Sequence, residues 1–334
     1  MTDVQTVLEA RPDLKIPIID IGPFLAGKPG ALEATAKALG EAAETIGFYF
    51  IGNHGIPQSL IDRVFAETQR FHELPLERKL EVQAIGKVIG YLPQGGQTQN
   101  SSVYARSTHP DTSASFYIRR EFPADHPDRL AKKPYVFDNR WPSDLPGYRD
   151  TCLEYYDAMS DLGMKMLRVH AVALGLPPDY LATQEAFQPA HNTLRLLHYP
   201  SRDMTKEGQF GIGPHTDYGY CTYLAQARTP GLEIMTRSGE WIEAPALAGH
   251  FLVNNADMCR RWTNDRWRSA PHRVINKTGE VRYSIPYFFG TRPDVKLTCL
   301  PTCQDAAHPA KYPPMSFGEY LAELEPKNYV LTKA

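Results

Sequence analysis

The segment that decides the fold is GIGPHTDYGYCTYL, residues 211–224, in which two potential metal ligands stand directly before an apolar, aromatic run. Such a run is typical of a strand. On an extended backbone, residues two positions apart project to the same face. His215 and Asp217 can therefore reach one ion, while Thr216 points away from it.

Two other His-x-Asp triplets show that the pattern alone says little. His109-Pro-Asp111 and His126-Pro-Asp128 lie in loops rich in proline, serine and aspartate, and no partner residues recur around them. Proline fixes the backbone in such turns. We expect both triplets to be solvated turns without a metal.

A metal site needs a third ligand, and His272 in the strand-like segment APHRVI (residues 270–275) is the best candidate. Pairing between distant strands would bring it next to His215 and Asp217. Two histidines and one carboxylate leave three positions of an octahedral iron(II) ion open, which suits the binding of oxygen and an organic molecule. The triad therefore favours a non-haem iron oxygenase.

Ten residues after His272 comes Arg282-Tyr-Ser284. Arg282 and Ser284 share a strand face by the same period of two. An arginine offers two parallel hydrogen bonds to a carboxylate, and a serine hydroxyl adds a third. Beside a metal, this pair predicts a clamp for an organic acid that also chelates the ion.

Helical and strand patterns divide the chain near residue 190. Before it, the spacing of apolar residues predicts helices over 31–45, 58–72 and 146–174, strands at 16–20, 47–51 and 115–118, and a loop-rich segment from 86 to 144. After it, short apolar runs predict strands at 193–199, 219–225, 231–236, 250–255, 272–276 and 281–289. Many short strands at this spacing indicate a sandwich or barrel, so the fold class is α+β.

The composition bounds the partners and the compartment. The 334 residues are 42% apolar and carry a net charge of −2, which argues against a nucleic-acid or acidic-membrane partner. No run approaches the roughly 20 apolar residues of a membrane helix, and MTDVQTVLEARPDLK has no secretory signal pattern. The scattered cysteines make no disulfide framework, so we expect reduced thiols in a cytoplasmic protein. The cysteines are Cys152, Cys221, Cys259, Cys299 and Cys303.

His215-x-Asp217, His272 and Arg282-x-Ser284, in this order and spacing, resemble the isopenicillin N synthase-like family of iron(II)/2-oxoglutarate dioxygenases. The resemblance covers nearly the whole chain. It includes IPIID (16–20), GFYFIGNHGIP (47–57) and FHELPLERK (71–79) near the N-terminus, and LRLLHYP (194–200), GPHTDYG (213–219) and FLVNNADM (251–258) in the core.

The resemblance implies a distorted double-stranded β-helix, or jelly roll, wrapped by helices. Residues 1–189 would form the helical and mixed N-terminal region, 190–300 the oxygenase core and 301–334 a C-terminal extension. It implies that iron(II) sits in the barrel mouth and that Arg282, Ser284 and Tyr199 contact the co-substrate 2-oxoglutarate. Oxygen would be consumed with release of succinate and carbon dioxide, ascorbate would stimulate turnover, and the substrate would undergo hydroxylation, desaturation or ring closure.

Two positions depart from the family pattern. Leu197 stands where many members carry an asparagine that accompanies the tyrosine matched by Tyr199. Ala256 stands where the usual turn has glycine, and alanine does not adopt a glycine-only conformation cheaply. Neither change touches the predicted metal ligands.

Other functions remain open at the level of sequence. An iron oxidase of the isopenicillin N synthase or aminocyclopropane-carboxylate oxidase type carries a similar clamp and works without the keto acid. A non-catalytic jelly-roll sensor and a zinc hydrolase are further alternatives. The substrate is expected to be a small organic molecule, with Phe288, Tyr117 and Tyr104 as candidate pocket walls, and no protein partner is implied.

Overall fold

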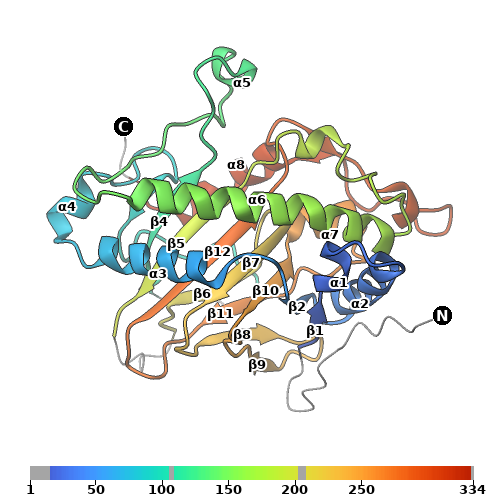
Figure 1. Cartoon of the computed structure of the whole chain (residues 1–334), viewed down its shortest axis with the longest axis horizontal. Coiled ribbons are helices and arrows are strands. Elements are labelled where there is room, and N and C mark those ends of the chain that lie inside the picture. Colours follow the sequence, from blue (N-terminus) through green and yellow to red (C-terminus); the bar gives the residue numbers. More distant parts are fainter. Residues whose placement is uncertain (1–15, 105–108, 202–207, 332–334) are drawn as a thin grey trace.

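The computed structural model describes residues 16–104, 109–201 and 208–331, and its centre is a large β-sheet (Figure 1). Along the sheet the strands follow the order β1-β2-β10-β7-β12-β5-β4-β3. Only the β1–β2 pair is parallel, and the other neighbours are antiparallel. The strands are β1 Ile18–Asp20, β2 Phe48–Gly52, β3 Gly90–Leu92, β4 Ala114–Arg119, β5 Thr193–Tyr199, β7 Cys221–Gln226, β10 His250–Asn255 and β12 Arg282–Phe289.

A smaller antiparallel sheet completes the jelly roll, with the order β6-β11-β8-β9. Its strands are β6 Ile212–His215, β8 Leu232–Met235, β9 Trp241–Glu243 and β11 His272–Val274. Apolar side chains from both sheets, including Leu197, Leu252 and Ile234, pack into one cluster between them. A short pair, β13 Lys296–Leu297 with β14 Met315–Ser316, lies apart from both sheets.

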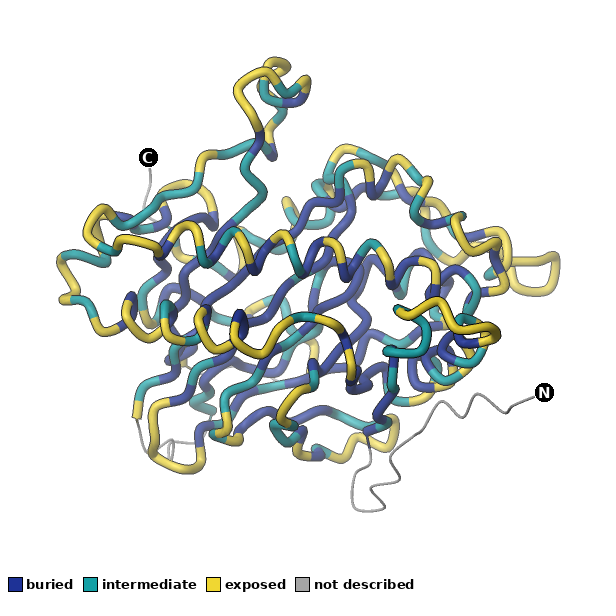
Figure 2. Tube along the Cα trace, in the orientation of Figure 1, coloured by how far each residue is buried: buried dark blue, intermediate teal, exposed yellow. Residues whose placement is uncertain are grey.

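Helices cover the opposite face of the large sheet (Figure 1). The long helix α6, Tyr148–Ala173, packs with α2 and α3 over the outward-facing side chains of the strands, such as Tyr223 and Tyr287. Figure 2 shows the buried strands beneath helices whose outer turns are exposed. The remaining helices are α1 Gly22–Leu25, α2 Ala31–Thr45, α3 Gln58–His72, α4 Leu76–Leu80, α5 Pro127–Leu130, α7 Asp257–Trp262, α8 Phe317–Asn328 and two 3₁₀ turns, Glu185–Phe187 and Pro301–Cys303.

Two helices and two strands have the limits that the sequence predicts. Helices α2 and α3 and strands β5 and β10 match their predicted ranges, and α6 is shorter than its predicted range at both ends. All five cysteines are free thiols, as expected. None of the helices in the described part of the chain is both long and apolar enough to cross a bilayer.

The expectation that both loop triplets are solvated turns is wrong for their aspartates. Asp111 is 1% exposed and Asp128 is 7% exposed. Asp128 lies in α5, where its carboxylate is 3.4 Å from the guanidinium of Arg292. The loop composition did not reveal these burials, because both carboxylates meet partners that lie far along the chain.

Candidate active site

The two sheets bring the predicted metal ligands together. His215 ends β6 and His272 begins β11, and these two residues pair directly across the strands. One Oδ of Asp217 lies 3.8 Å from Nε2 of His215 and 3.7 Å from Nε2 of His272. The three side chains offer one ligand atom each, all within 4.8 Å of one another, which is a spacing that one metal ion can bridge.

A contact between Nδ1 and a backbone carbonyl oxygen fixes the orientation of each histidine ring. Nδ1 of His215 is 2.8 Å from the carbonyl oxygen of Gly213, and Nδ1 of His272 is 3.3 Å from that of Ala270. A carbonyl at Nδ1 favours the tautomer in which Nδ1 donates and Nε2 is free for a metal. Both rings therefore present Nε2 toward Asp217.

The carboxylate of Asp217 is held by its other oxygen. Oδ2 accepts hydrogen bonds from Oγ1 of Thr222 at 2.6 Å and from Nδ2 of Asn254 at 2.7 Å. Oδ1 is left to face the two histidines. Thr216 turns away, as predicted, and its hydroxyl donates to Asp257.

The charges of the triad also suit a metal. Burial, together with His272, lowers the pKa of His215 to about 3, so its imidazole is neutral and can ligate. Burial opposes ionisation of Asp217, but His272, His215 and the two hydrogen bonds outweigh it and lower the pKa of this carboxyl. Two histidine nitrogens with one carboxylate form the donor set expected for iron(II).

The predicted clamp lies in a cavity of about 50 Å³, which the triad also lines. Arg282 is 1% exposed, and burial lowers its pKa. Its Nε donates to the carbonyl of Thr229 and its Nη2 to the side chain of Gln226, both at 3.2 Å. Its Nη1 has no hydrogen-bond partner among the described residues. A buried guanidinium with a free N–H group fits the carboxylate of a bound acid.

The other clamp residues lie next to Arg282. The ring of Tyr199 is 4.8 Å from the guanidinium carbon, and Oγ of Ser284 is 3.5 Å from the Tyr199 hydroxyl. Leu197 pairs with Ser284 across β5 and β12 and lines the same cavity. The structure therefore places all three predicted co-substrate residues, and the departing Leu197, around one cavity that ends at the triad.

The other departure from the family pattern has no structural cost. Ala256 has φ −114° and ψ 179°, an extended conformation that any residue adopts. The glycine of the family turn is therefore not required here.

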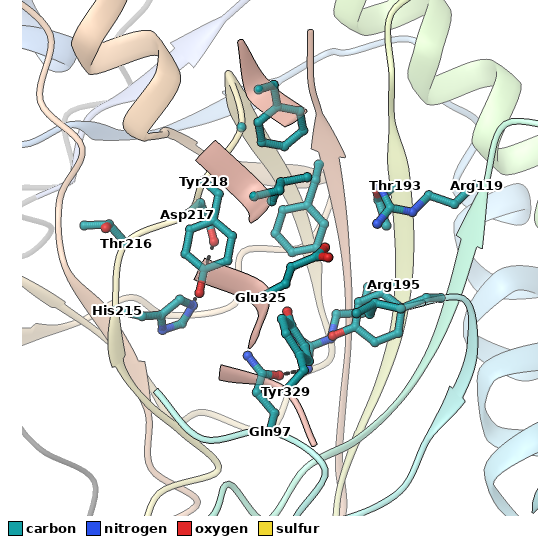
Figure 3. A pocket seen from close by; sticks show the side chains of 16 residues that line it. Gln97, Arg119, Thr193, Arg195, His215, Thr216, Asp217, Tyr218, Glu325 and Tyr329 are labelled. Atoms are coloured by element: carbon teal, nitrogen blue, oxygen red, sulfur yellow. Dashed lines mark hydrogen bonds and ion pairs between the residues drawn. The ribbon is translucent and has the colours of Figure 1, made fainter. Parts of the chain in front are cut away.

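A further cavity, of about 80 Å³, is lined by His215 and Asp217 of the triad but not by His272 (Figure 3). Phe288 and Tyr117, two of the candidate pocket walls, line it. Tyr104 does not line it and has 41% of its surface exposed. Helix α8 and the residue after it supply one wall, through Phe317, Leu321, Glu325 and Tyr329.

Sequence reasoning missed the buried Arg195, which lines both this cavity and the clamp cavity. The period of two along β5 was the available signal, because it places Arg195 on the same face as Leu197 and Tyr199. It also missed Asp111, whose Oδ1 accepts a 2.9 Å hydrogen bond from the backbone N–H of Gly213. Since the Gly213 carbonyl orients His215, Asp111 supports the triad from outside it.

Comparisons with known proteins agree with this geometry. Residues 16–144 match the family described as non-haem dioxygenase in morphine synthesis N-terminal, and residues 190–291 match the 2OG-Fe(II) oxygenase superfamily. The 2-oxoglutarate-Fe(II) type oxidoreductase hxnY of Emericella nidulans is 37% identical, over 90% of this chain and 86% of that protein. A homoarginine-6-hydroxylase of Glycine max is 32% identical, over 94% of this chain and 97% of that protein.

A solved structure extends the likeness to three dimensions. A full-length Neurospora crassa protein, crystallised in complex with alpha-KG and thymine, is similar at a TM-score of 0.80 and 30% identity, over 93% of this chain and 96% of that one. The likeness spans both the helical N-terminal region and the jelly roll. The chain therefore belongs to the 2OG-Fe(II) oxygenase superfamily, and it is an iron(II)- and 2-oxoglutarate-dependent dioxygenase.

Proposed function

We propose that His215, Asp217 and His272 hold the iron(II) and that Arg282, Ser284 and Tyr199 hold 2-oxoglutarate. The observation that carries this assignment is the single cavity that joins the triad to the unpaired Nη1 of buried Arg282. One carboxylate of the keto acid would satisfy that N–H group, and its other end would reach the metal. The iron and the keto acid together supply the oxidising chemistry when both are bound.

The chain's own residues then orient and shield the reactants. Thr222 and Asn254 keep the free oxygen of Asp217 aimed at the ion. Apolar residues such as Leu197 and Leu232 exclude water around the keto acid, which strengthens its hydrogen bonds to Arg282. The residues of this chain thereby set where the keto acid lies. Oxidation of a small organic molecule is coupled to the conversion of this keto acid to succinate and carbon dioxide.

The cavity beyond the triad is the proposed substrate site. Phe288 and Tyr117 are proposed as its walls, and Tyr104 is left out because it does not line the cavity. Relatives differ in what their names say they act on, since one is a homoarginine hydroxylase and one structure holds thymine. Both are small molecules, and we infer the same of this substrate.

The division of the chain and its compartment are also proposed. Residues 1–189, 190–300 and 301–334 would act as one unit, because β1 to β4 join the large sheet and α8 lines the substrate cavity. Reduced thiols support a cytoplasmic location. No nucleic-acid or protein partner is proposed.

The test is oxygen consumption by the iron(II)-loaded protein with ascorbate, with and without 2-oxoglutarate. We expect consumption and succinate release only with the keto acid, slowly even without substrate. Equal product formation without the keto acid would instead identify an oxidase of the isopenicillin N synthase type.

A further inference from the structure

Arg195 is a buried cation that is held rigidly beside the triad. It is 4% exposed, its Nε donates to Ser115 at 2.9 Å, and its Nη2 donates to the side chain of Gln97 at 2.7 Å. The ring of Tyr117 lies 4.9 Å from its guanidinium carbon. The third nitrogen, Nη1, makes no hydrogen bond to a described residue. Three contacts thus fix the guanidinium and leave one edge for a ligand.

The charge of Arg195 lacks a close counter-ion in the described part of the chain. Burial opposes its charge, while the nearby Tyr117 and, more weakly, Asp111 favour it and leave its pKa raised. The hydrogen-bond partners of its guanidinium among the described residues are the uncharged side chains of Ser115 and Gln97. A buried, unpaired charge is costly, so such a group is normally completed by a partner. An oxygen of a bound molecule is the partner that the cavity can admit.

Strand register separates Arg195 from the co-substrate clamp. Across β5 and β12, Tyr199 pairs with Arg282, Leu197 with Ser284, and Thr193 with Phe288. Arg195 lies between the last two pairs and so stands nearer to Phe288 than the clamp does. Its free edge is therefore placed for the substrate cavity rather than for the distal carboxylate of the keto acid.

Glu325 supplies the opposite charge in the same cavity. It projects from α8, and its carboxylate has no hydrogen bond or ion pair to a described residue. Figure 3 shows this carboxylate within the pocket, with Tyr218 and Arg195 also lining it. An unpaired carboxylate is an acceptor for an N–H group of a ligand.

Aromatic side chains make up much of the remaining wall, beside Arg119, Thr193 and aliphatic residues. The aromatic residues that line the cavity include Phe288, Tyr117, Tyr218 and Tyr329. Aromatic faces of this kind pack well against a planar ring.

We propose that the substrate is a small planar ring that carries a carbonyl or carboxylate oxygen and an N–H group. Arg195 receives the oxygen and Glu325 receives the N–H group, while Phe288 packs on the ring. The inference rests on the proposed function, because it takes the cavity beside the triad as the substrate site. Arg195 and Glu325 are then specificity-determining residues of that site.

The experiment is calorimetric titration of four ring probes into the protein loaded with manganese(II) and 2-oxoglutarate. Thymine carries both groups, benzoate carries only the oxygen acceptor, benzylamine only the N–H donor, and toluene neither. We expect thymine to bind at least about tenfold more tightly than toluene, with benzoate and benzylamine between them. Equal affinity for thymine and toluene, or no binding of any probe, would overturn the proposed class.

Substitutions test each contact separately. Arg195→Met should weaken thymine and benzoate about ten- to hundredfold, the scale of one lost hydrogen bond to a charged group, and should leave benzylamine unchanged. Arg195→Lys should recover part of the loss, because it keeps the charge without the fixed geometry. Glu325→Gln should weaken benzylamine most, since it removes the charge and keeps an oxygen acceptor. The matched control is Glu323→Gln, an exposed position on the same helix, which should change no affinity.

The affinity for 2-oxoglutarate, measured in the same variants, distinguishes failure of the substrate inference from failure of the proposed function. It should stay within about threefold of wild type in Arg195→Met, which also shows that the variant is folded. Loss of keto-acid binding with unchanged probe binding would assign Arg195 to the co-substrate and overturn this inference alone. Failure of the wild-type protein to bind manganese or 2-oxoglutarate would overturn the proposed function itself.

Discussion

Two segments share the His-x-Asp pattern but differ in their structural surroundings. They are His215-Thr-Asp217 and His109-Pro-Asp111. In the first, both side chains turn toward one point that a third residue, His272, also reaches. In the second, the histidine is exposed and the aspartate is buried against the backbone of Gly213. The second segment thus supports the strand that carries the first.

The difference shows that strand pairing, rather than the triplet, makes a metal site. His215 has His272 directly opposite on a neighbouring strand, and Asp217 has Thr222 and Asn254 to hold its second oxygen. The carboxyl of Asp111 accepts a hydrogen bond from the main-chain N–H group of Gly213 instead. Of the two segments, only the first belongs to a group of potential metal ligands among the described residues.

The largest effect is expected when the first segment is broken. His215→Ala, Asp217→Ala and His272→Ala should each lower iron affinity by more than about a hundredfold, because loss of even an outer partner of a ligand costs 10–100-fold. Turnover should disappear with the iron, while the fold stays intact. Iron content after desalting measures this, and full activity of His272→Ala would exclude that residue as the third ligand.

The next effect concerns the co-substrate and leaves the metal in place. Arg282→Ala removes one partner of a desolvated pair, at a cost of about 2–5 kcal/mol, or roughly thirty-fold to several-thousand-fold in the Kd of 2-oxoglutarate. Arg282→Lys should recover part of the loss. Ser284→Ala should weaken the binding free energy of 2-oxoglutarate by about 1–3 kcal/mol. Anaerobic titration of the metal-to-ligand absorption band measures all three, and unchanged Kd in Arg282→Ala would remove the clamp.

Breaking the second segment should cost stability more than chemistry. Asp111→Ala leaves the N–H group of Gly213 without its acceptor, which should lower the free energy of unfolding by about 1–3 kcal/mol. Asp111→Asn keeps an oxygen acceptor at the same position and should cost less. Urea denaturation measures both variants, and equal losses for Ala and Asn would show that the hydrogen bond to Gly213 is not the reason.

The carboxyl of Asp111 should also make the free energy of unfolding depend on pH, in a direction set by its raised pKa. Burial raises the pKa of Asp111 from 3.8 to about 7, so the folded protein holds this proton more tightly than the unfolded chain. The contribution of this bound proton to the free energy of unfolding is fully present below pH 3.8 and is lost as the pH rises through about 7. The stability of wild type relative to Asp111→Asn should therefore fall across this window and be flat above it. A difference that grows with pH would contradict the raised pKa.

The smallest effects are expected at the histidines of the loop triplets. His109→Ala should change stability by no more than about 0.5 kcal/mol, as for most exposed positions. His126→Ala should cost about 1 kcal/mol at most, because its ring accepts a hydrogen bond from the N–H group of Asp128 at the start of α5. Neither should alter iron content, and a loss of iron in either variant would reveal a second metal-binding segment.

The sequence predicted what depends on local periodicity. Helix α3 has the predicted limits because its apolar residues repeat at 3.6, and strand β5 has them because it is a short apolar run. The period of two also linked His215 to Asp217 and Arg282 to Ser284. The burial of Asp111 could not be predicted in this way, since its partner Gly213 lies 102 residues away. The position of Glu325 in the cavity was missed for the same reason, because only the packing of α8 brings it there.

The most direct test makes one substitution in both segments. Asp217→Asn and Asp111→Asn are purified, incubated with one equivalent of iron(II) without oxygen, desalted and assayed for iron beside wild type. We expect about one iron per chain in wild type and Asp111→Asn, and almost none in Asp217→Asn, because only Asp217 contributes a ligand atom. Equal iron in the two variants would contradict the assignment of the metal to His215, Asp217 and His272.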